Sequence, residues 1–361
     1  MKRAEIRARL DEWRREGRFE PRCDSWLAGY DEDFTRLLGA EGWIGLTWSP
    51  EYGGHGRGFA ERFVLTEELL RAGAPVAAHW IADRQIGPAV ARLGTEELRR
   101  HILPRIASGE ARFCLGMSEP DAGSDLASVR TRATRVDGGW ELHGQKVWSS
   151  NAHRSTHAYV LARTAHGTKR HEGLTEFVLD LDQPGVTVRR IPDLRGPGHF
   201  CEVFLDGATV PDAWVLGTVG DGWTQVTEQL SFERGGPERV LSTYPLLRLM
   251  LDSGGGWRLG ELVARLTALR ALGRQVAARM DAGEAPIAAA ATLKLLGNRF
   301  EVDVIEAARE LTRADVGAAA WPRFAAMLAD AQLSAPGFSL RGGTTEVLGV
   351  VVARSALEGA R

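Results

Sequence analysis

Two short segments bring hydroxyl, carboxylate and aromatic side chains together with glycine and proline. Residues 115–125 read LGMSEPDAGSD, and residues 143–150 read HGQKVWSS. Each segment alone has an ordinary interpretation, because residues 118–120 (SEP) are typical of a turn and Trp148 is typical of a hydrophobic core. The occurrence of both segments, in this order and at this spacing, favours a functional site instead.

Two more segments extend the pattern along the chain. Residues 50–54 read PEYGG, and residues 202–211 read EVFLDGATVP. In order and in sequence the four segments resemble the acyl-CoA dehydrogenase family, and residues 115–125 match it nearly residue for residue. The resemblance implies FAD-dependent dehydrogenation of the Cα–Cβ bond of an acyl-CoA or acyl-carrier thioester, which gives the trans-2-enoyl thioester. It also implies an electron-transferring flavoprotein as the electron acceptor.

A flavin needs hydrogen-bond donors at its pyrimidine edge, where negative charge collects when N5 accepts hydride. The resemblance implies that Met117 and Ser118 line one side of the isoalloxazine ring, and that Trp148 and Ser150 line the other. It places Ser124 against the pantetheine arm of the acyl-CoA. The residues that the family implies for FAD are Leu115, Met117, Ser118, Trp148, Ser150, Thr344 and Glu346; those for the substrate are Ser124, Arg234 and Gly343.

Removal of a proton α to a thioester needs a carboxylate base and a hydrogen bond to the thioester oxygen. Many family members carry this base as the glutamate of a Tyr-Glu-Gly-Thr stretch, but here Gly342 stands at that position, within residues 341–346 (RGGTTE). Other members use a glutamate that directly precedes an arginine on the helix after the β-domain, which here is Glu233. We therefore expect Glu233 to be the base and the N–H of Gly342 to bond the thioester oxygen, with Arg234 as a substrate-side or structural cation. The alternative is an ion pair between Glu233 and Arg234 at the helix end.

Two FAD-binding motifs that homotetrameric relatives supply from a neighbouring subunit do not occur in this sequence. Residues 251–260 (LDSGGGWRLG) lack the Arg-x-x-Phe-Gly loop, and residues 315–338 lack the Gln-x-x-Gly-Gly-x-Gly turn. We therefore expect a heteromer with a second acyl-CoA dehydrogenase-like subunit, as in steroid-degrading members of the family, with a homo-oligomer as the alternative. Two other functions stay open: a non-catalytic partner subunit, and a flavin oxidase or monooxygenase on the same fold.

The elements that must position these residues change in type along the chain. Residues 1–112 show the spacing of helices, with Thr95 as a predicted N-cap ahead of two glutamates. Residues 113–219 hold short apolar or β-branched runs, and the turn signal within residues 136–140 predicts a hairpin. Residues 220–361 are helical again. With the resemblance, this order predicts an α+β fold: an N-terminal helical domain, a middle β-barrel domain and a C-terminal four-helix bundle. Helices of the last part are predicted near 223–251, 258–282, 287–313, 319–331 and 344–358, and strands of the middle part at 159–162, 176–179 and 186–188.

The composition is that of an ordinary globular protein. The chain has 361 residues, 44% of them hydrophobic and 25% charged, which is enough for two or three subdomains. The formal net charge of -2 predicts no general attraction to nucleic acid or to an anionic membrane, and no apolar run is long enough to span a bilayer. Cys23, Cys114 and Cys201 are widely spaced and odd in number, and no signal peptide is visible, so we expect reduced thiols in a cytoplasmic protein. The histidines lack ligand spacing, so we expect no metal site.

Overall fold

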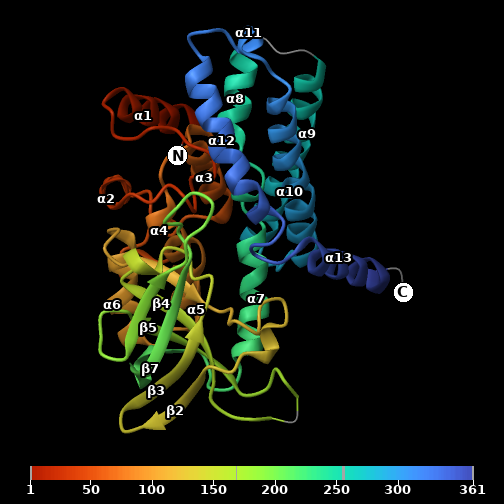
Figure 1. Ribbon diagram of the computed structural model, residues 1–361. Helices are drawn as coiled ribbons and strands as arrows, with labels where there is room; N and C mark the ends of the chain where they lie inside the picture. Colours follow the sequence, from red (N-terminus) through yellow and green to blue (C-terminus); the bar gives the residue numbers. More distant parts are fainter. Residues whose placement is uncertain (1, 168, 254–256, 360–361) are drawn as a thin grey trace. The chain divides into compact units, whose positions relative to one another are not determined.

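The structure is a computed structural model that describes residues 2–167, 169–253 and 257–359 (Figure 1). Within these ranges the side chains of residues 230–234, 257–258 and 358–359 are not described. The chain divides by its internal contacts into two compact units. Unit 1 consists of residues 1–29, 58–76 and 230–361, and unit 2 of residues 30–57 and 77–229. The three-domain division at residues 112 and 219 stays a prediction from the sequence.

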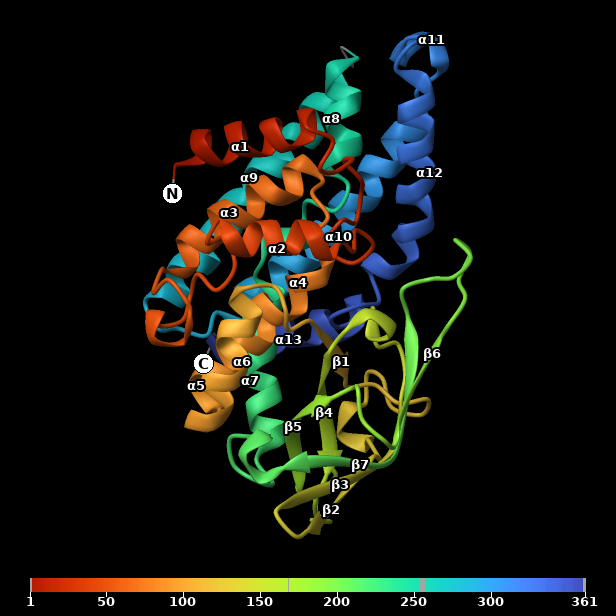
Figure 2. The same ribbon diagram turned by 90° about the vertical axis from the view of Figure 1, so that its left-hand side faces the viewer.

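Unit 1 is a bundle of helices drawn from both ends of the chain. Helix α3 (Phe59–Ala72) packs against α1 (Arg3–Arg15) and α9 (Trp257–Asp281), as Figure 2 shows. Helix α10 (Ile287–Arg309) packs against α9 and also contacts α8 (Tyr244–Asp252), α12 (Trp321–Phe338) and α13 (Thr345–Gly359); α11 (Arg313–Val316) precedes α12. The helical character predicted for the C-terminal part of the chain is therefore confirmed.

The single helix predicted over residues 223–251 was wrong. Helix α7 (Gly222–Arg234) begins in unit 2 and ends at Arg234, and a 3₁₀ turn at Pro237–Arg239 separates it from α8. The break follows from residues 235–237 (GGP), because glycine weakens a helix and proline clashes with the preceding turn and lacks an N–H. The helical spacing of apolar residues on either side concealed this interruption.

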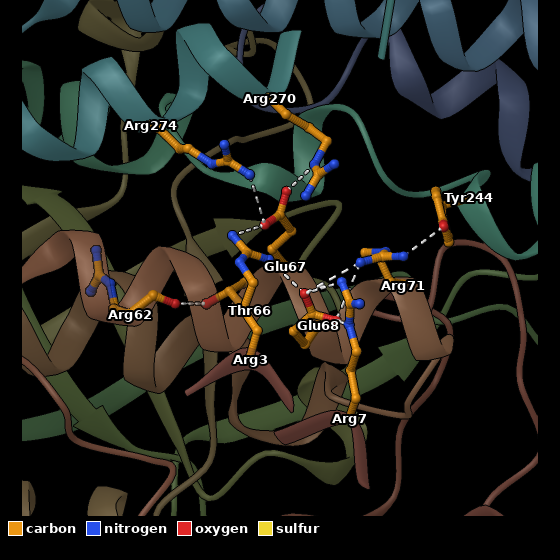
Figure 3. A network of polar contacts seen from close by, with 10 residues as sticks. All are labelled: Arg3, Arg7, Arg62, Thr66, Glu67, Glu68, Arg71, Tyr244, Arg270 and Arg274. Carbon is orange, nitrogen blue, oxygen red and sulfur yellow. Dashed lines mark hydrogen bonds and ion pairs between the residues drawn. The ribbon is translucent and has the colours of Figure 1, made fainter. Parts of the chain in front are cut away.

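Two adjacent glutamates tie α1 and α9 to α3 within unit 1 (Figure 3). Glu67 and Glu68 are both buried on α3. Arg3 and Arg7 of α1 contact Glu68 at 2.5 and 2.7 Å, and Arg270 of α9 forms an ion pair with Glu67. Burial alone would raise the pKa of Glu68, but the arginines outweigh burial and hold that pKa below its usual value. Both carboxylates therefore stay ionised and join three helices.

Unit 2 is built on one eight-stranded sheet with the order β6-β7-β3-β2-β4-β5-β8, in which β1 pairs with β4. Pairing is mostly antiparallel, but β1 runs parallel to β4. The predicted strand runs are confirmed as parts of β4, β5 and β6. The strands are β1 (Phe113–Gly116), β2 (Arg132–Val136), β3 (Gly139–Lys146), β4 (His157–Arg163), β5 (Leu174–Asp180), β6 (Val186–Arg190), β7 (Cys201–Pro211) and β8 (Val215–Leu216).

The predicted hairpin and helix start in unit 2 are also confirmed. Strands β2 and β3 pair as far as Val136 and Gly139, and Gly138 takes a φ of 75° in the turn between them, which a glycine adopts without strain. The Thr95 side chain accepts a hydrogen bond from the Leu98 N–H at 3.2 Å and so caps α6. The helices of this unit besides the first part of α7 are α2 (Glu32–Ala40), α4 (Ala77–Ile81), α5 (Gly87–Leu93) and α6 (Glu96–Ala107), with a π-helix at Ala82–Ile86.

The three cysteines are free and buried. None is paired in a disulfide within the part of the chain that the structure describes. In that same part, no helix has both the length and the apolar character that crossing a membrane requires.

Candidate active site

Within unit 2, residues 115–125 are hydrogen-bonded to residues 143–150. The Ser149 hydroxyl donates to the Leu115 carbonyl at 2.8 Å, and the Val147 N–H donates to the Ser118 carbonyl at 2.9 Å. The Lys146 ammonium donates to the Met117 carbonyl at 3.2 Å. Three carbonyls of residues 115–118 therefore face the end of β3 and the residues that follow it, up to Ser149. Because N–H and C=O point in opposite directions across a trans peptide, the N–H of Ser118 points away from β3.

A buried ion pair holds this arrangement in place. The Lys146 side chain is completely buried, and its Nζ lies 2.8 Å from Glu119 Oε1. The Glu119 carboxylate also accepts from the N–H groups of Arg130 and Thr131, at 2.6 and 2.9 Å. Burial lowers the pKa of Lys146 to about 8, against the opposing charge and hydrogen bond of Glu119. The pair is therefore ionised at neutral pH and joins residues 117–119 to the ends of β2 and β3.

Removing the ammonium group is expected to destabilise unit 2, because the buried Glu119 charge then loses its partner. Lys146→Met should lower the free energy of unfolding by about 3 kcal/mol, the scale for breaking one side of a buried ion pair. Urea unfolding followed by circular dichroism measures this change. Lys169→Met, at an exposed lysine, is the matched control and should shift stability by less than about 0.5 kcal/mol. An unchanged unfolding midpoint for Lys146→Met would show that the ion pair does not stabilise unit 2.

The Trp148 side chain is not a core residue. It is 57% exposed, and its backbone has a φ of 61°, which is uncommon for a residue with a side chain. Its ring meets Phe200 edge to face, with the centroids 5.7 Å apart. The neighbouring residue is pinned, because Ser149 exchanges backbone hydrogen bonds of 3.0 and 3.1 Å with Cys201. A rigid backbone thus presents an aromatic face outward, as strained residues at ligand sites often do.

These residues fit the flavin that the resemblance implies. The exposed Trp148 ring supplies an aromatic surface, while the hydroxyls of Ser118 and Ser150 and the outward N–H of Ser118 are neutral hydrogen-bond donors. Such donors suit the polar edge of an isoalloxazine ring. Leu115 and Met117, like the two serines, are partly exposed. Unit 2 thus brings together five of the predicted FAD-binding residues, and their contacts with FAD stay predictions.

Ser124 lies in the exposed loop between residue 122 and a 3₁₀ turn at Leu126–Ser128. Arg163 of β4 holds this loop by donating hydrogen bonds to the carbonyls of Ala127 and Val129, at 3.0 and 3.3 Å. An exposed hydroxyl on a loop fastened in this way is available to a ligand. Its contact with the pantetheine arm stays a prediction.

In unit 1, residues 341 and 343 are each held by a polar contact with a buried side chain. The Arg341 guanidinium contacts both carboxylate oxygens of the buried Asp24, at 2.8 and 2.5 Å, and lies 4.5 Å above the Trp26 ring. The ammonium of the buried Lys294 donates to the Gly343 carbonyl at 2.8 Å. Gly342 and Gly343 have φ values of 68° and 94°. Two fixed cations therefore hold a glycine pair in a backbone shape that other residues rarely adopt.

Thr344 and Glu346 are at the start of α13. The Thr344 hydroxyl accepts from the Val347 N–H at 3.3 Å. Hydrogen bonds from its own backbone N–H and from Thr344 hold the pKa of Glu346 below its usual value. Both side chains thus stabilise the helix N-terminus, and the FAD-binding role expected for them stays a prediction.

The proposed base lies outside the described side chains. Glu233 and Arg234 belong to the last turn of α7, but the structure describes neither side chain. Residues 254–256, in the segment that lacks the first FAD motif, also lie outside the described residues. The choice between a base and a helix-end ion pair at Glu233 therefore stays as the sequence left it.

Sequence reasoning passed over four charged residues that support the site. Glu119 and Lys146 lie inside the quoted segments, and a lysine and a glutamate in an otherwise apolar and small-residue context could have signalled a buried pair. Arg341 directly precedes Gly342, yet nothing local shows that its partner is Asp24, far away along the chain. Lys294 lies in an alanine-rich helix with no adjacent acid in its sequence.

Comparison with known proteins identifies the fold and the domain order. Models for the N-terminal, middle and C-terminal domains of acyl-CoA dehydrogenases match residues 2–110, 114–208 and 248–357. The acyl-CoA dehydrogenase IpdE1 of Mycobacterium tuberculosis is 44% identical over 202 residues, which is 56% of this chain and 52% of that protein. FadE34 of the same organism is 36% identical over 289 residues, which is 76% of this chain and 40% of that protein. The chain thus spans about half or less of the length of these curated relatives.

Solved structures share the same fold. The Tcur3481-Tcur3483 steroid ACAD has a TM-score of 0.83 and 27% identity, covering 99% of this chain and 96% of that chain. The ChsE4-ChsE5 complex from Mycobacterium tuberculosis has a TM-score of 0.80 and 25% identity, with coverage of 99% and 96%. Family members are FAD-dependent oxidoreductases that act on the CH–CH group of acyl-CoA. Because three domain models of one family match in order along residues 2–357, the chain belongs to the acyl-CoA dehydrogenase family.

Proposed function

We propose that this chain carries out FAD-dependent α,β-dehydrogenation of an acyl-CoA or acyl-carrier thioester, with the trans-2-enoyl thioester as product. The observation that supports it most is the exposed Trp148 ring together with the partly exposed Ser118 and Ser150, on a backbone to which Lys146 is hydrogen-bonded. A chain that no longer bound a flavin would have no need to expose an indole ring on a left-handed backbone. The similar solved structure named as a steroid ACAD adds steroid-derived acyl groups to the candidate substrates.

In this mechanism FAD, when bound, supplies the acceptor for the hydride from the β-carbon. The N–H and hydroxyl of Ser118 and the hydroxyl of Ser150 stabilise the negative charge that this transfer brings. Glu233 takes the proton from the α-carbon, and Ser124 holds the pantetheine arm. An electron-transferring flavoprotein then accepts the electrons.

Gly342 fits this mechanism although it carries no carboxylate. Its N–H is the proposed donor to the thioester oxygen, where charge builds up as the α-proton leaves. The anchoring of residue 341 to Asp24 and of residue 343 to Lys294 keeps this peptide in one orientation. A donor that does not have to reorganise stabilises charge more effectively.

The function is tested by adding a panel of acyl-CoA thioesters to the flavin-loaded protein and following loss of flavin absorbance, with a dye as final acceptor. Bleaching by at least one thioester, with an enoyl product, is the expected result. The absence of bleaching across short, branched and steroid side-chain thioesters would instead favour a non-catalytic partner subunit. That second reading draws its support from Gly342 and from the two missing FAD motifs.

The second proposal concerns assembly: we infer a heteromer with another acyl-CoA dehydrogenase-like subunit. This chain lacks both motifs that would complete a neighbour's FAD site, and residues 321–338 form the helix α12 rather than a glycine turn. Leu340 before α13, and Val350 and Leu357 on it, are exposed apolar side chains, as subunit interfaces require. Two of the similar solved structures are named as pairs of different chains.

The heteromer makes a prediction about flavin content. Purified alone, the chain should hold clearly less than one FAD per subunit, because the cationic and glycine-rich groups for the pyrophosphate are missing. Co-expression with an acyl-CoA dehydrogenase-like partner should yield a mixed complex with tightly bound flavin. The ratio of flavin to protein absorbance, with light scattering for mass, measures both. One tightly held FAD per chain in a homo-oligomer would contradict the proposal.

We also propose a cytoplasmic location. The three free thiols are buried, and Cys23, Cys114 and Cys201 suit a reducing compartment. Cell fractionation with an antibody against the chain tests this location.

A further inference from the structure

A carboxyl group is buried in unit 2 at a position for which the proposed reaction has no use. Glu176 lies on β5 and is completely buried. Its carboxyl accepts hydrogen bonds from the Tyr159 hydroxyl of β4 and from the side-chain amides of Gln225 and Gln229 of α7. The two amide contacts measure 2.8 and 3.2 Å. A single carboxyl thus joins the sheet to the first half of α7.

Gln225 makes this attachment rigid. Besides its bond to Glu176, its amide N–H₂ donates to the Leu216 carbonyl of β8 at 3.1 Å, and its oxygen accepts from the Thr218 N–H at 3.1 Å. Gln229 follows four residues later and therefore lies on the same face of α7. On the face of α7 that meets the sheet, both glutamines donate to the same titratable group, Glu176.

The cluster accepts a proton without any movement of its heavy atoms. The Tyr159 oxygen lies within hydrogen-bond distance of both Glu176 Oε1 and Gln229 Oε1, the latter at 3.0 Å. When Glu176 is ionised, the Tyr159 hydroxyl donates to it. When Glu176 is protonated, its own O–H can donate to Tyr159, while the Tyr159 O–H turns to Gln229. Both charge states are therefore hydrogen-bonded.

Among the described side chains, few charged groups lie near the cluster. Arg92 of α5 acts on Glu176 through its charge, but it is also paired with Glu228 at 3.0 Å, at the surface. The His171 ring stacks on Trp223 of α7, with the centroids 5.9 Å apart. Burial raises the pKa of Glu176 to about 7, although the three hydrogen bonds and the charge of Arg92 oppose the shift.

We propose that Glu176 is a positioning residue that anchors α7 to the sheet, firmly when protonated and more loosely when ionised. Because α7 continues without a break to Arg234, its anchoring bears on residue 233, a link that rests on the proposed function. The direction of the pH dependence follows from the difference in proton binding between the docked and the detached helix. The docked carboxyl keeps its proton up to about pH 7, whereas a detached one loses it above about pH 4.5, so docking weakens as pH rises between these values and levels off above them.

Hydrogen exchange of the ligand-free chain tests the anchor. We would measure amide protection in residues 222–229 from pH 5 to pH 8.5, corrected for the intrinsic effect of pH. In the wild type, protection should fall by up to about tenfold per pH unit below pH 7, the slope for release of one proton. Glu176→Gln, which mimics the protonated acid, should lose this dependence. Glu228→Gln, an exposed change on the same helix, should keep it.

Equal pH dependence in the wild type and Glu176→Gln, or none in the wild type, would overturn the proposal. If Glu176→Gln does not fold, Tyr159→Phe serves instead: loss of the hydroxyl donor should raise the pKa of Glu176 and move the midpoint to higher pH. If the pH midpoint of amide protection in Tyr159→Phe is the same as in the wild type, that result would count equally against the anchor. The experiment uses neither flavin nor substrate, so its failure would leave the Glu233 proposal untouched, and an inactive enzyme would leave the anchor untouched.

Discussion

Glu233→Gln is expected to slow substrate-dependent bleaching of the flavin by about 10³-fold while FAD stays bound, because general-base catalysis typically contributes 10²–10⁴-fold. Glutamine keeps the shape of the side chain but cannot take the α-proton of the thioester. Rapid mixing of the flavin-loaded protein with the thioester identified in the screen measures this rate. The absorption spectrum before mixing shows whether FAD is retained.

Glu228→Gln is the matched control for this experiment. Glu228 is an exposed glutamate on the same helix, in an ion pair with Arg92, so its replacement should leave the bleaching rate near that of the wild type. If Glu233→Gln bleaches as fast as the wild type, Glu233 is not the base and the helix-end ion pair with Arg234 becomes the better account. Slow bleaching with normal FAD content is the only result that supports the assignment.

Arg341→Met is expected to lower the free energy of unfolding of unit 1 by about 4 kcal/mol. The change removes the guanidinium that contacts both oxygens of Asp24, a side chain that is 99% buried by its neighbours, and leaves that charge unpaired. It also removes the cation above the Trp26 and Phe338 rings. Chemical denaturation followed by circular dichroism gives the loss.

A double variant separates the unpaired charge from the lost packing. Asp24 has a φ of 52°, so asparagine, which tolerates this conformation, is the suitable replacement. Asp24→Asn combined with Arg341→Met removes both charges of this pair and should recover part of the loss. Equal destabilisation in the single and the double variant would show that the ion pair contributes little and that the ring contacts dominate.

The sequence predicted those parts of the molecule that depend on local pattern. The capped start of α6 at Thr95 and the hairpin around Gly138 are decided by a few adjacent residues, and both are confirmed. The helix predicted over residues 223–251 failed because the helical pattern on either side outweighed one Gly-Gly-Pro sequence in the interpretation. A proline preceded by two glycines should have ended the helix.

The sequence could not predict which distant groups support the site. Trp148 was expected beside a flavin only through the family resemblance, since periodicity alone favours burial of an indole. Asp24 and Arg341 are 317 positions apart, and Glu176 meets Gln225 from 49 positions away. Such pairs form only once the chain is folded, so neither spacing nor propensity in one sequence reveals them.

The backbone at residues 342 and 343 limits which side chains either position can carry without strain. With φ values of 68° and 94°, either position would be strained by about 1–2 kcal/mol if it carried a side chain. A mutation that restored the glutamate common elsewhere in the family would therefore meet a conformational barrier as well as the cations that hold the adjoining residues. A single substitution at residue 342 is therefore not enough to place an unstrained carboxylate there, because the backbone that Asp24 and Lys294 hold through residues 341 and 343 must change as well.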